Sequence, residues 1–235
     1  MTSTDRDADL RDGPVVRAGG QWRQGMLGVL LIGLAALPLS VLVSTGDGPV
    51  VRFDERVSAA AERAVAGSEL LLVGAQATTL LGEPLLATLA SAGLALLLWR
   101  RGHSRLALLV LASRLGASVL STGLKVAVGR TRPVFDEPVA TALGAAFPSG
   151  HALAASAFWA TAAVVVAHFV GRRVALLTGA IAIALVVCVS RVLLGVHYPS
   201  DVLAGLLLGL GWTAVCSAVL TSRRREAAAG REAAA

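Results

Sequence analysis

Residues 174–194 read VALLTGAIAIALVVCVSRVLL, and this stretch decides the class of fold. It has no charged side chain before Arg191, and its length is that of a helix that crosses the hydrocarbon core of a bilayer. Of the 235 residues in the chain, 55% are hydrophobic and only 15% are charged, which is too few charges to cover a soluble domain of this size. The stretch therefore predicts a transmembrane helix.

Five other stretches have the same character, and together the six predict an all-α bundle of six transmembrane helices. The five are residues 26–44, 84–99, 106–126, 152–169 and 202–220. The first is longer than the apolar part of a usual signal peptide, and no A-x-A site follows it directly, so we expect an uncleaved span. In the last, Gly205 and Gly209 form a G-x-x-x-G pattern, which favours close packing within the bundle over homodimerisation.

The rest of the chain consists of two tails and one region of mixed character. Residues 1–25 are polar and without hydrophobic periodicity, which indicates a disordered cytoplasmic tail. The membrane domain covers residues 26–222, and residues 223–235 form a second cytoplasmic tail. Residues 47–83 mix charges with Ala, Val and Leu, and their apolar part, 70–81, is too short to cross a bilayer. We expect an amphipathic helix at the outer interface there, with a re-entrant hairpin as the alternative.

Basic residues between the spans predict the orientation of the chain in the cell membrane. Arginines gather in the connections after the second and fourth spans and in the C-terminal tail: Arg100, Arg101, Arg105, Arg172, Arg173, Arg223, Arg224 and Arg225. With the N-terminus inside, six spans place all of them and the C-terminus in the cytoplasm, as the positive-inside rule requires. Lys125, Arg130, Arg132 and Arg191 fall on the outer side, where the rule disfavours them, and so they point to a site.

Composition also limits the partners. The net charge is +6, but the basic residues are dispersed at segment ends with almost no aromatic residues between them, so we expect no nucleic acid partner. A lipid bilayer is the better match for these charges. Cys188 and Cys216 both lie within apolar runs and are expected to be buried hydrophobic residues rather than a disulfide or a metal pair. The sequence leaves the oligomeric state open.

Three polar clusters lie at the predicted outer ends of the spans. The first, KVAVGRTRP at residues 125–133, leaves the third span, and the second, PSGH at residues 148–151, opens the fourth. The third consists of Ser190 and Arg191 at the end of the fifth span and of HYPSD at residues 197–201, which opens the sixth. The six-span topology brings all three clusters to one face of the bundle.

The residue types in these clusters suit a phosphoryl group. Lys125, Arg132 and Arg191 supply positive charge and directed hydrogen-bond donors for an oxyanion. Ser149 and Gly150 precede a helix, where free backbone N–H groups and the helix dipole also favour an anion. Gly150 has no side chain that would hold the anion away from the backbone.

Two histidines and one carboxylate supply the reactive groups. His197 and Asp201 are four residues apart where a helix begins, so the carboxylate can reach the imidazole. A carboxylate bound to one ring nitrogen fixes the tautomer and leaves the other nitrogen free to attack phosphorus. His151, on a different span, is then free to donate a proton to the leaving oxygen.

At these residues the sequence resembles the type 2 phosphatidic acid phosphatase superfamily, which also includes vanadium haloperoxidases. The three signatures of that family, K-x6-R-P, P-S-G-H and S-R-x5-H-x3-D, are present, complete and in order. The resemblance covers residues 84–220, the core of the membrane domain, and implies a six-helix bundle of the same type. It also implies a phosphohistidine intermediate at His197, oriented by Asp201, with His151 as general acid and then as base.

The resemblance further implies how the phosphate is held and whether a cofactor is needed. The phosphate would be bound by Lys125, Arg132, Ser149, Gly150 and Arg191. The family needs no metal, and the sequence holds no carboxylate or Cys/His cluster of metal-ligand spacing, so we expect no cofactor. The haloperoxidases of the family are soluble and larger, which counts against that activity here.

These observations predict a lipid phosphate phosphohydrolase that acts at the extracytoplasmic face of the membrane. Its substrate would belong to the phosphatidic acid, phosphatidylglycerol phosphate or polyprenyl diphosphate class, with the tail in the bilayer and the headgroup in the pocket. One alternative is phosphoryl transfer from a lipid donor to a lipid or sugar acceptor. Another is a transporter or scaffold without enzymatic activity, which the histidines disfavour because binding alone needs no nucleophile.

Two arginines are not explained by this pattern. Arg114 falls near the middle of the third span, where an ionised side chain is expected to face the bundle interior. No partner can be named for it, since Asp136 and Glu137 are predicted to lie in the outer loop. Arg130 is expected to be an interfacial anchor, with an auxiliary headgroup contact as the alternative.

Overall fold

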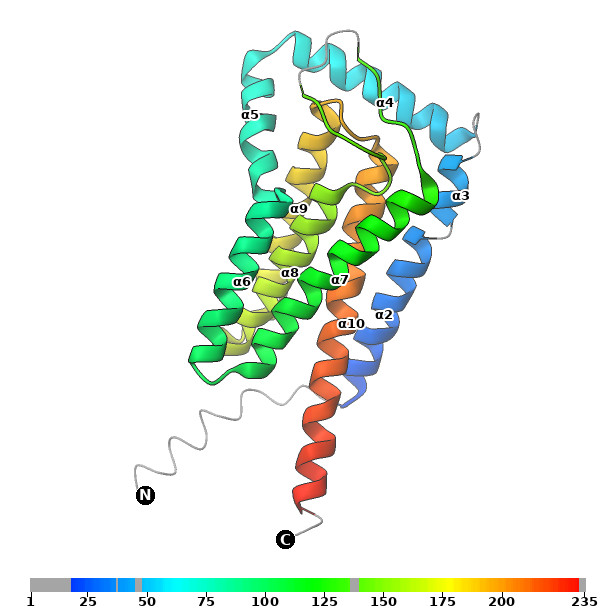
Figure 1. Cartoon of the computed structure of the whole chain (residues 1–235). Coiled ribbons are helices and arrows are strands. Elements are labelled where there is room, and N and C mark those ends of the chain that lie inside the picture. Colours follow the sequence, from blue (N-terminus) through cyan, green and yellow to red (C-terminus); the bar gives the residue numbers. More distant parts are fainter. Residues whose placement is uncertain (1–17, 37, 45–47, 136–139, 233–235) are drawn as a thin grey trace.

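The computed structural model describes residues 18–36, 38–44, 48–135 and 140–232, which form helices and the connections between them (Figure 1). No β-strand occurs within these ranges. Six helical segments of the described chain are long and apolar enough to cross a membrane: Arg23–Ser44, Glu69–Arg100, Ser104–Val128, Gly150–Val170, Arg173–Leu193 and Pro199–Leu220. Each overlaps one of the predicted spans, so the prediction of an all-α, multi-pass membrane protein is confirmed.

The helices begin and end at recognisable local signals. They are α2 (Ala18–Ala36), α3 (Pro38–Ser44), α4 (Pro49–Ala66), α5 (Glu69–Thr79), the 3₁₀ turn η1 (Leu80–Gly82), α6 (Pro84–Arg100), α7 (Ser104–Val128), α8 (Gly150–Val170), α9 (Arg173–Leu193) and α10 (Pro199–Glu232). Prolines open α4 and α6, where a backbone N–H would have no intrahelical acceptor. Gly129 and Gly171 end α7 and α8 in the left-handed conformation that glycine adopts without strain.

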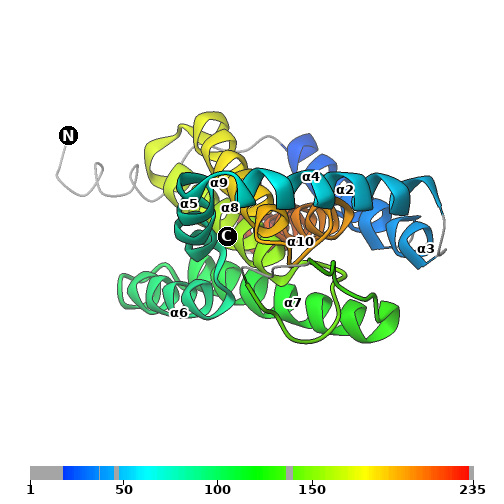
Figure 2. The ribbon, with the colours of Figure 1, turned by 90° about the horizontal axis from the view of Figure 1, so that it is seen from above.

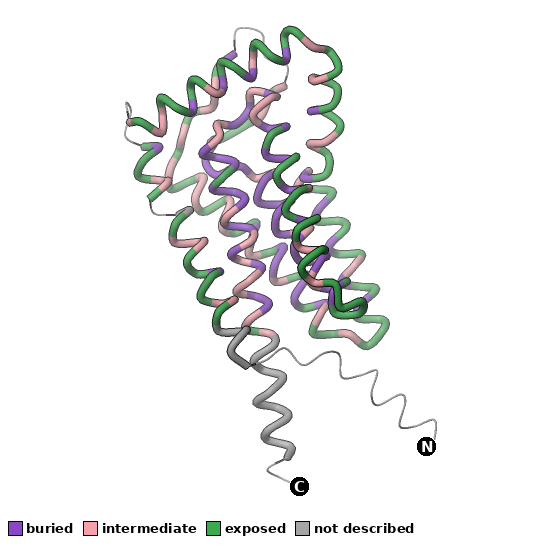
Figure 3. The backbone as a smooth tube through the Cα atoms, turned by 180° about the vertical axis from the view of Figure 1, so that it is seen from behind, coloured by how far each residue is buried: buried purple, intermediate pink, exposed green. Residues whose placement is uncertain are grey.

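The centre of the bundle is formed by α8 and α10. In each of them 56% of the most apolar window is buried, against 13–33% in the other four spans. Figure 3 shows the buried residues on the sides of the helices that face one another and the exposed residues on the outside. Leu85, Leu89 and Val119 are among the large apolar side chains that stay exposed, as expected where acyl chains surround the bundle.

Two glycines allow α10 to approach α8 closely. A Cβ atom on Gly205 would lie 2.6 Å from the carbonyl oxygen of Ser149, and one on Gly209 would overlap Ser156 Oγ and lie 2.7 Å from the carbonyl oxygen of Leu153. Real Cβ atoms do not come this close to other atoms, so only glycine fits at either position. The G-x-x-x-G pattern thus serves packing within the bundle, as the sequence favoured.

The helix α4 crosses the end of the bundle where α10 begins (Figure 2). Its buried residues are Asp54, Ser58, Ala61 and Val65, which recur every three or four positions and form one side of the helix. This side faces α9 and α10. The predicted amphipathic helix between the first and second spans is therefore confirmed for Pro49–Ala66.

The next helix, α5, differs from the prediction because it continues toward α6 instead of lying at the interface. Ser68 accepts a hydrogen bond from the backbone N–H of Leu71 and starts a new helix after α4. From Glu69 the chain runs through α5, η1 and α6 as one apolar segment of 32 residues, and α5 packs along α9. The predicted span 84–99 is only the second part of this element. Residues 70–81 are too short to cross a bilayer alone, but they form the first part of this longer segment.

At both ends of the chain the helices extend beyond the candidate membrane spans, which begin at Arg23 and end at Leu220. Helix α2 begins at Ala18, within the segment 1–25 expected to be a disordered tail, and residues 1–17 lie outside the described residues. Helix α10 continues to Glu232, past the expected boundary at residue 222, and residues 233–235 lie outside the described part. The sequence RRREAAAGRE after residue 222 consists almost entirely of strong helix formers, which explains why the helix goes on.

Candidate active site

The three polar clusters meet at the end of the bundle that α4 crosses. Nη1 of Arg132 lies 3.2 Å from Nε2 of His197, which joins the first cluster to the third. The backbone N–H of Ser149 donates to the carbonyl oxygen of Asp201 at 3.0 Å, which joins the second cluster to the third. Arg132 and Arg191 both interact electrostatically with His151 and with His197. The three clusters therefore share one site.

His197 and Asp201 face each other at the start of α10. Both are buried, with 2% and 0% of their surface exposed. Oδ2 of Asp201 accepts a hydrogen bond from the backbone N–H of Tyr198 at 2.9 Å and lies 3.6 Å from Nδ1 of His197. This separation is slightly longer than a hydrogen bond, so a small rotation of the ring is enough to form one. Nδ1 is thus directed at the carboxylate, and Nε2 is directed at Arg132.

The imidazole of His197 is neutral at neutral pH. Burial lowers the pKa of His197 to about 4; Asp201 opposes this shift, while Arg132 and Arg191 add to it. A neutral ring with Nδ1–H directed at Asp201 has its lone pair on Nε2. Nε2 is also the nitrogen that lies next to Arg132.

Backbone carbonyls of the loop before α8 hold two of the cations in place. Nζ of Lys125 donates to the carbonyl oxygen of Ala145 at 2.6 Å. Arg132 donates from Nε to Gly144 at 3.0 Å and from Nη1 to Val196 at 2.6 Å, in both cases to the carbonyl oxygen. The loop and the connection before α10 therefore fix the guanidinium of Arg132 beside His197.

The third cation, Arg191, comes from the last turn of α9. Its Nη1 donates to Oγ1 of Thr79 at 2.8 Å, and its buried Nε has no hydrogen-bond partner within the described residues. An ionised donor that is buried without an acceptor is costly, and an anionic ligand would remove that cost.

The first turn of α8 supplies the second cluster. Oγ of Ser149 accepts from the backbone N–H of Ala152 at 3.5 Å and caps the helix. A Cβ atom on Gly150 would meet only Ser121 Oγ, at 3.7 Å, so there is room next to the backbone at this position. A helix N-terminus with room beside it is suited to an anion.

Glu83, which the sequence did not single out, pairs with His151. Its Oε2 lies 2.8 Å from Nε2 of His151. Glu83 stands between η1 and α6, and the sequence separation of 68 residues gives no hint of the contact. The one available signal was a lone carboxylate inside an apolar stretch that extends from residue 70 to residue 98.

Arg130 is neither an interfacial anchor nor a headgroup contact, because two buried carboxylates bind it. Nη1 lies 2.6 Å from Oδ1 of Asp201, and Nη2 lies 2.7 Å from Oδ2 of Asp54. The guanidinium also stacks on the ring of Tyr198, 4.2 Å from its centroid. Burial disfavours the charge, but Asp201 and Asp54 raise the pKa of Arg130 above its ordinary value.

Asp54 was also missed, and it connects α4 to the start of α10. Its carboxylate accepts hydrogen bonds from the backbone N–H of Ser200 at 3.0 Å and from Oγ of the same residue. The side chain is fully buried. Its position on the inward side of an amphipathic helix, in line with Ser58, Ala61 and Val65, was the signal that could have identified it.

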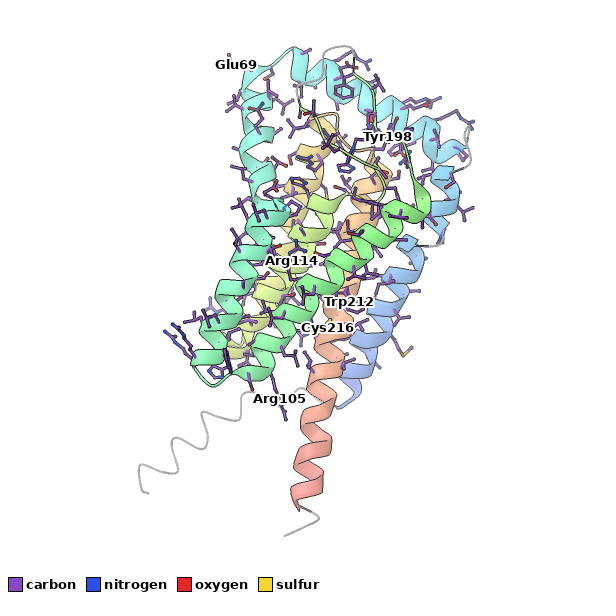
Figure 4. All side chains as sticks on the ribbon, viewed as in Figure 1. Glu69, Arg105, Arg114, Tyr198, Trp212 and Cys216 are labelled. Carbon is purple, nitrogen blue, oxygen red and sulfur yellow. The ribbon has the colours of Figure 1, made fainter. Side chains whose placement is uncertain are left out.

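Arg114 faces the interior of the bundle, as expected for a charge within a span. It donates to Thr88 Oγ1 at 2.9 Å, to Ser118 Oγ at 2.6 Å and to the carbonyl oxygen of Pro84 at 2.9 Å. Figure 4 shows it about halfway along the bundle, far from Tyr198. Asp136 and Glu137 lie outside the described residues.

An apolar groove lies between α5 and α9, with a volume of about 590 Å³. Ser190, the residue before Arg191, contributes to its wall. Most of the lining is aliphatic: Leu70, Leu71, Leu185, Val186, Val189 and Leu193. Elsewhere in the described residues, Cys188 and Cys216 are free and buried, and no three His, Cys, Asp or Glu side chains gather in a metal-binding arrangement.

Known proteins share the sequence and the fold of this region. A family model described as the PAP2 superfamily matches residues 106–225. The lipid A 1-phosphatase of Rhizobium etli is 35% identical over 116 residues, which cover 46% of this chain and 47% of the relative. The corresponding enzyme of Rhizobium johnstonii is 34% identical over 116 residues, with 46% and 44% covered. The chain thus spans about half the length of these curated relatives.

A solved structure matches over a larger share of the chain. The crystal structure of a transmembrane PAP2 type phosphatidylglycerolphosphate phosphatase from Bacillus subtilis aligns with a TM-score of 0.70 and 26% identity. The alignment covers 81% of this chain and 94% of the other. The similarity therefore extends beyond the matched family segment, to helices that precede residue 106.

Proposed function

The chain belongs to the PAP2 superfamily, and from this premise we propose that it hydrolyses the phosphate of a membrane lipid through a phosphohistidine at His197. The observation that carries the proposal is the orientation of this ring. Nδ1 faces the carboxylate of Asp201 at 3.6 Å, and Nε2 faces Arg132 at 3.2 Å. A neutral imidazole with its lone pair among cations is ready to attack a phosphate that those cations hold.

The reaction then proceeds in two steps. In the first, Nε2 of His197 forms a bond to phosphorus, the bond from phosphorus to the lipid oxygen breaks, and His151 gives a proton to that oxygen. In the second, water attacks phosphorus, the bond from nitrogen to phosphorus breaks, and His151 takes the proton of the water. Asp201 stabilises the positive charge on His197 while the intermediate exists.

Binding of the phosphate falls to the three cations and the start of α8. Lys125, Arg132 and Arg191 offset the charge on the equatorial oxygens, and Ser149 and Gly150 present the helix N-terminus to them. Because these groups supply the positive charge that a metal ion would otherwise provide, we propose that the reaction needs no metal. The unpartnered Nε of Arg191 supports a ligand at this position.

Two observations support a lipid substrate. The groove between α5 and α9 is largely aliphatic and about 590 Å³ in volume, and its wall includes Ser190, the residue before Arg191. It can therefore receive a tail while the headgroup reaches the cations. The relatives named above act on lipid A and on phosphatidylglycerolphosphate, which both carry phosphate on a lipid. The candidate classes are phosphatidic acid, phosphatidylglycerol phosphate, polyprenyl diphosphate and lipid A 1-phosphate.

The distribution of charge supports an extracytoplasmic site with both termini in the cytoplasm. The arginines of the connections after α6 and α8 lie at the end of the bundle away from α4, where Figure 4 labels Arg105. The site lies at the end that α4 crosses. By the positive-inside rule, the first end is cytoplasmic and the second is outside.

A phosphate-release assay on the purified protein tests the proposal. We expect one or more of the four lipid classes to release inorganic phosphate in the presence of a chelator, and His197→Ala to abolish the release. His103→Ala is the matched control, because His103 lies at the opposite end of the bundle before α7, and it should keep wild-type activity. Undiminished turnover by His197→Ala would rule out this nucleophile, and label that moves from the lipid to an acceptor instead of to phosphate would identify a transferase.

A further inference from the structure

A short segment before α6 touches the site at several points, although no signature of the family includes it. The segment is TLLGE at residues 79–83, which precedes the first residue of the matched family model. Oγ1 of Thr79 accepts from Nη1 of Arg191 at 2.8 Å, and the carbonyl oxygen of Leu81 accepts from Nε1 of Trp159 at 2.9 Å. These two hydrogen bonds hold the segment against α8 and α9.

Gly82 brings this segment against the first turn of α8. A Cβ atom on Gly82 would lie 2.9 Å from the carbonyl oxygen of His151 and 2.5 Å from Cγ1 of Val187. Only a residue without a side chain allows this approach, and the next residue is then Glu83. The backbone contact places the Glu83 carboxylate at the His151 imidazole, with Oε2 2.8 Å from Nε2.

The two histidines of the site thus each have a carboxylate, but the two carboxylates differ in their neighbours. Asp201 is fully buried and shares its charge with Arg130 at 2.6 Å. Glu83 is in direct contact with His151 and also interacts electrostatically with Arg191, without an ion pair to it. The carboxylate of Asp201, by contrast, contacts a permanent cation directly, because it forms a buried ion pair with Arg130.

This difference fits two different tasks. A nucleophile must be neutral, and a general acid must carry a proton that it can release. Oε2 of Glu83 lies 2.8 Å from Nε2 of His151, where a carboxylate can stabilise the positive charge of an imidazolium. With one ring nitrogen on Glu83, the other is free for the leaving oxygen.

We propose that Glu83 is a positioning residue that holds His151 for proton transfer to the leaving oxygen of the substrate. The proposal rests on the proposed function, because it presupposes that His151 is the general acid. Glu83 itself forms no bond to the substrate. It fixes the ring of His151 and stabilises the imidazolium that gives up its proton when the bond from phosphorus to oxygen breaks.

The test compares two leaving groups with the same alkyl tail. An alkyl phosphate releases a strongly basic alkoxide that must be protonated, whereas a nitrophenyl phosphate with that tail releases a weakly basic phenolate that leaves without a proton. We expect Glu83→Gln to lower kcat/KM for the alkyl phosphate by about 10²-fold, the lower range for general acid catalysis, and to change the nitrophenyl phosphate little. Glu69→Gln, at the start of α5, is the matched control and should leave both rates unchanged.

A double-mutant cycle with His151 sharpens the test. We expect His151→Ala to show the same selective loss, and the double variant Glu83→Gln/His151→Ala to be no worse than His151→Ala alone, because both changes remove one function. Glu83→Asp, which keeps the charge on a shorter side chain, should be faster on the alkyl phosphate than Glu83→Gln. This second variant also reports on the charge if the glutamine variant folds poorly.

The results of these experiments distinguish a failure of the role of Glu83 from a failure of the proposed function. Equal losses on both substrates, additive losses in the cycle, or a wild-type rate of Glu83→Gln on the alkyl phosphate would each overturn the role of Glu83. None of these results affects the nucleophile. Failure of the proposed function has a different signature, namely no phosphate release by the wild type or full activity of His197→Ala on both substrates.

Discussion

Nη1 of Arg130 lies 2.6 Å from Oδ1 of Asp201, and this buried ion pair joins the chain after α7 to the first turn of α10. The other oxygen of Asp201 is directed at Nδ1 of His197. One carboxylate thus stands between a permanent cation and an imidazole. Because Arg130 already balances its charge, Asp201 can orient the ring of His197 without keeping a proton on it at neutral pH.

Removal of Arg130 should destabilise the fold. Arg130→Ala leaves Asp54 and Asp201 buried without their cation, and a broken buried ion pair costs about 3–5 kcal/mol. We expect a clear drop in the temperature of unfolding in detergent micelles. Arg105→Ala removes an exposed arginine at the other end of the bundle and should unfold at the wild-type temperature. Equal unfolding temperatures for wild type and Arg130→Ala would show that this ion pair does not stabilise the fold.

The two carboxylates that bind Arg130 should differ in their effect on activity. Asp201→Asn removes the charge that faces His197, and in a serine protease the corresponding change lowers kcat about 10⁴-fold, so we expect a loss approaching that size. Asp54→Asn removes the partner of Arg130 that does not face His197 and should lower stability with a far smaller loss of kcat. Phosphate-release rates and unfolding temperatures of both variants check this. Equal losses of kcat would contradict the assignment of Asp201 to His197.

His197 should make stability depend on pH in a defined window. Burial lowers its pKa from 6.5 to about 4, so between these values the unfolded chain binds a proton that the folded chain does not. The contribution of His197 to stability is therefore lost as the pH falls from 6.5 to about 4, and it amounts to about 3 kcal/mol for such a shift. We expect the difference in unfolding temperature between wild type and His197→Gln to change in this window and to stay constant above it. Parallel curves would mean that His197 titrates normally.

The contact between α8 and α10 should tolerate no methyl group. Gly209→Ala would place Cβ against Ser156 Oγ and the carbonyl oxygen of Leu153, and overpacking of this kind costs about 1–3 kcal/mol. Gly93→Ala, in α6, meets nothing within 4 Å and should be neutral or stabilising because alanine favours the helix. Thermal unfolding of the two variants in the same detergent checks the contrast. If Gly209→Ala is as stable as Gly93→Ala, the two helices are not in backbone contact.

The sequence predicts the spans well because the signal for each span is local. An apolar run of the right length specifies a membrane helix whatever its neighbours are. The continuation of α5 into α6 was not predictable in this way, since residues 70–81 alone fail the length criterion and Pro84 suggests a break. The 3₁₀ turn η1 bridges that break, and it is stabilised by contacts with α8 and α9 that are distant in sequence.

The site was predictable only where fixed spacings describe it. Residues of the three signatures could be named because their separations are short and specified. Asp54 and Glu83 could not, since they contact residues 146 and 68 positions away and belong to no signature. The interpretation of Arg130 failed for the same reason, because one of its two carboxylates is Asp54.

The backbone contact at Gly205 and Gly209 has a consequence for the two histidines. Where glycine lies directly against the backbone of the neighbouring helix, there is little room for one helix to slide along the other. His151 lies in the first turn of α8 and His197 just before α10, so this contact keeps the two histidines at a constant separation along the helix axes. We expect the spacing of the two imidazoles to stay the same when the surrounding bilayer thins or thickens.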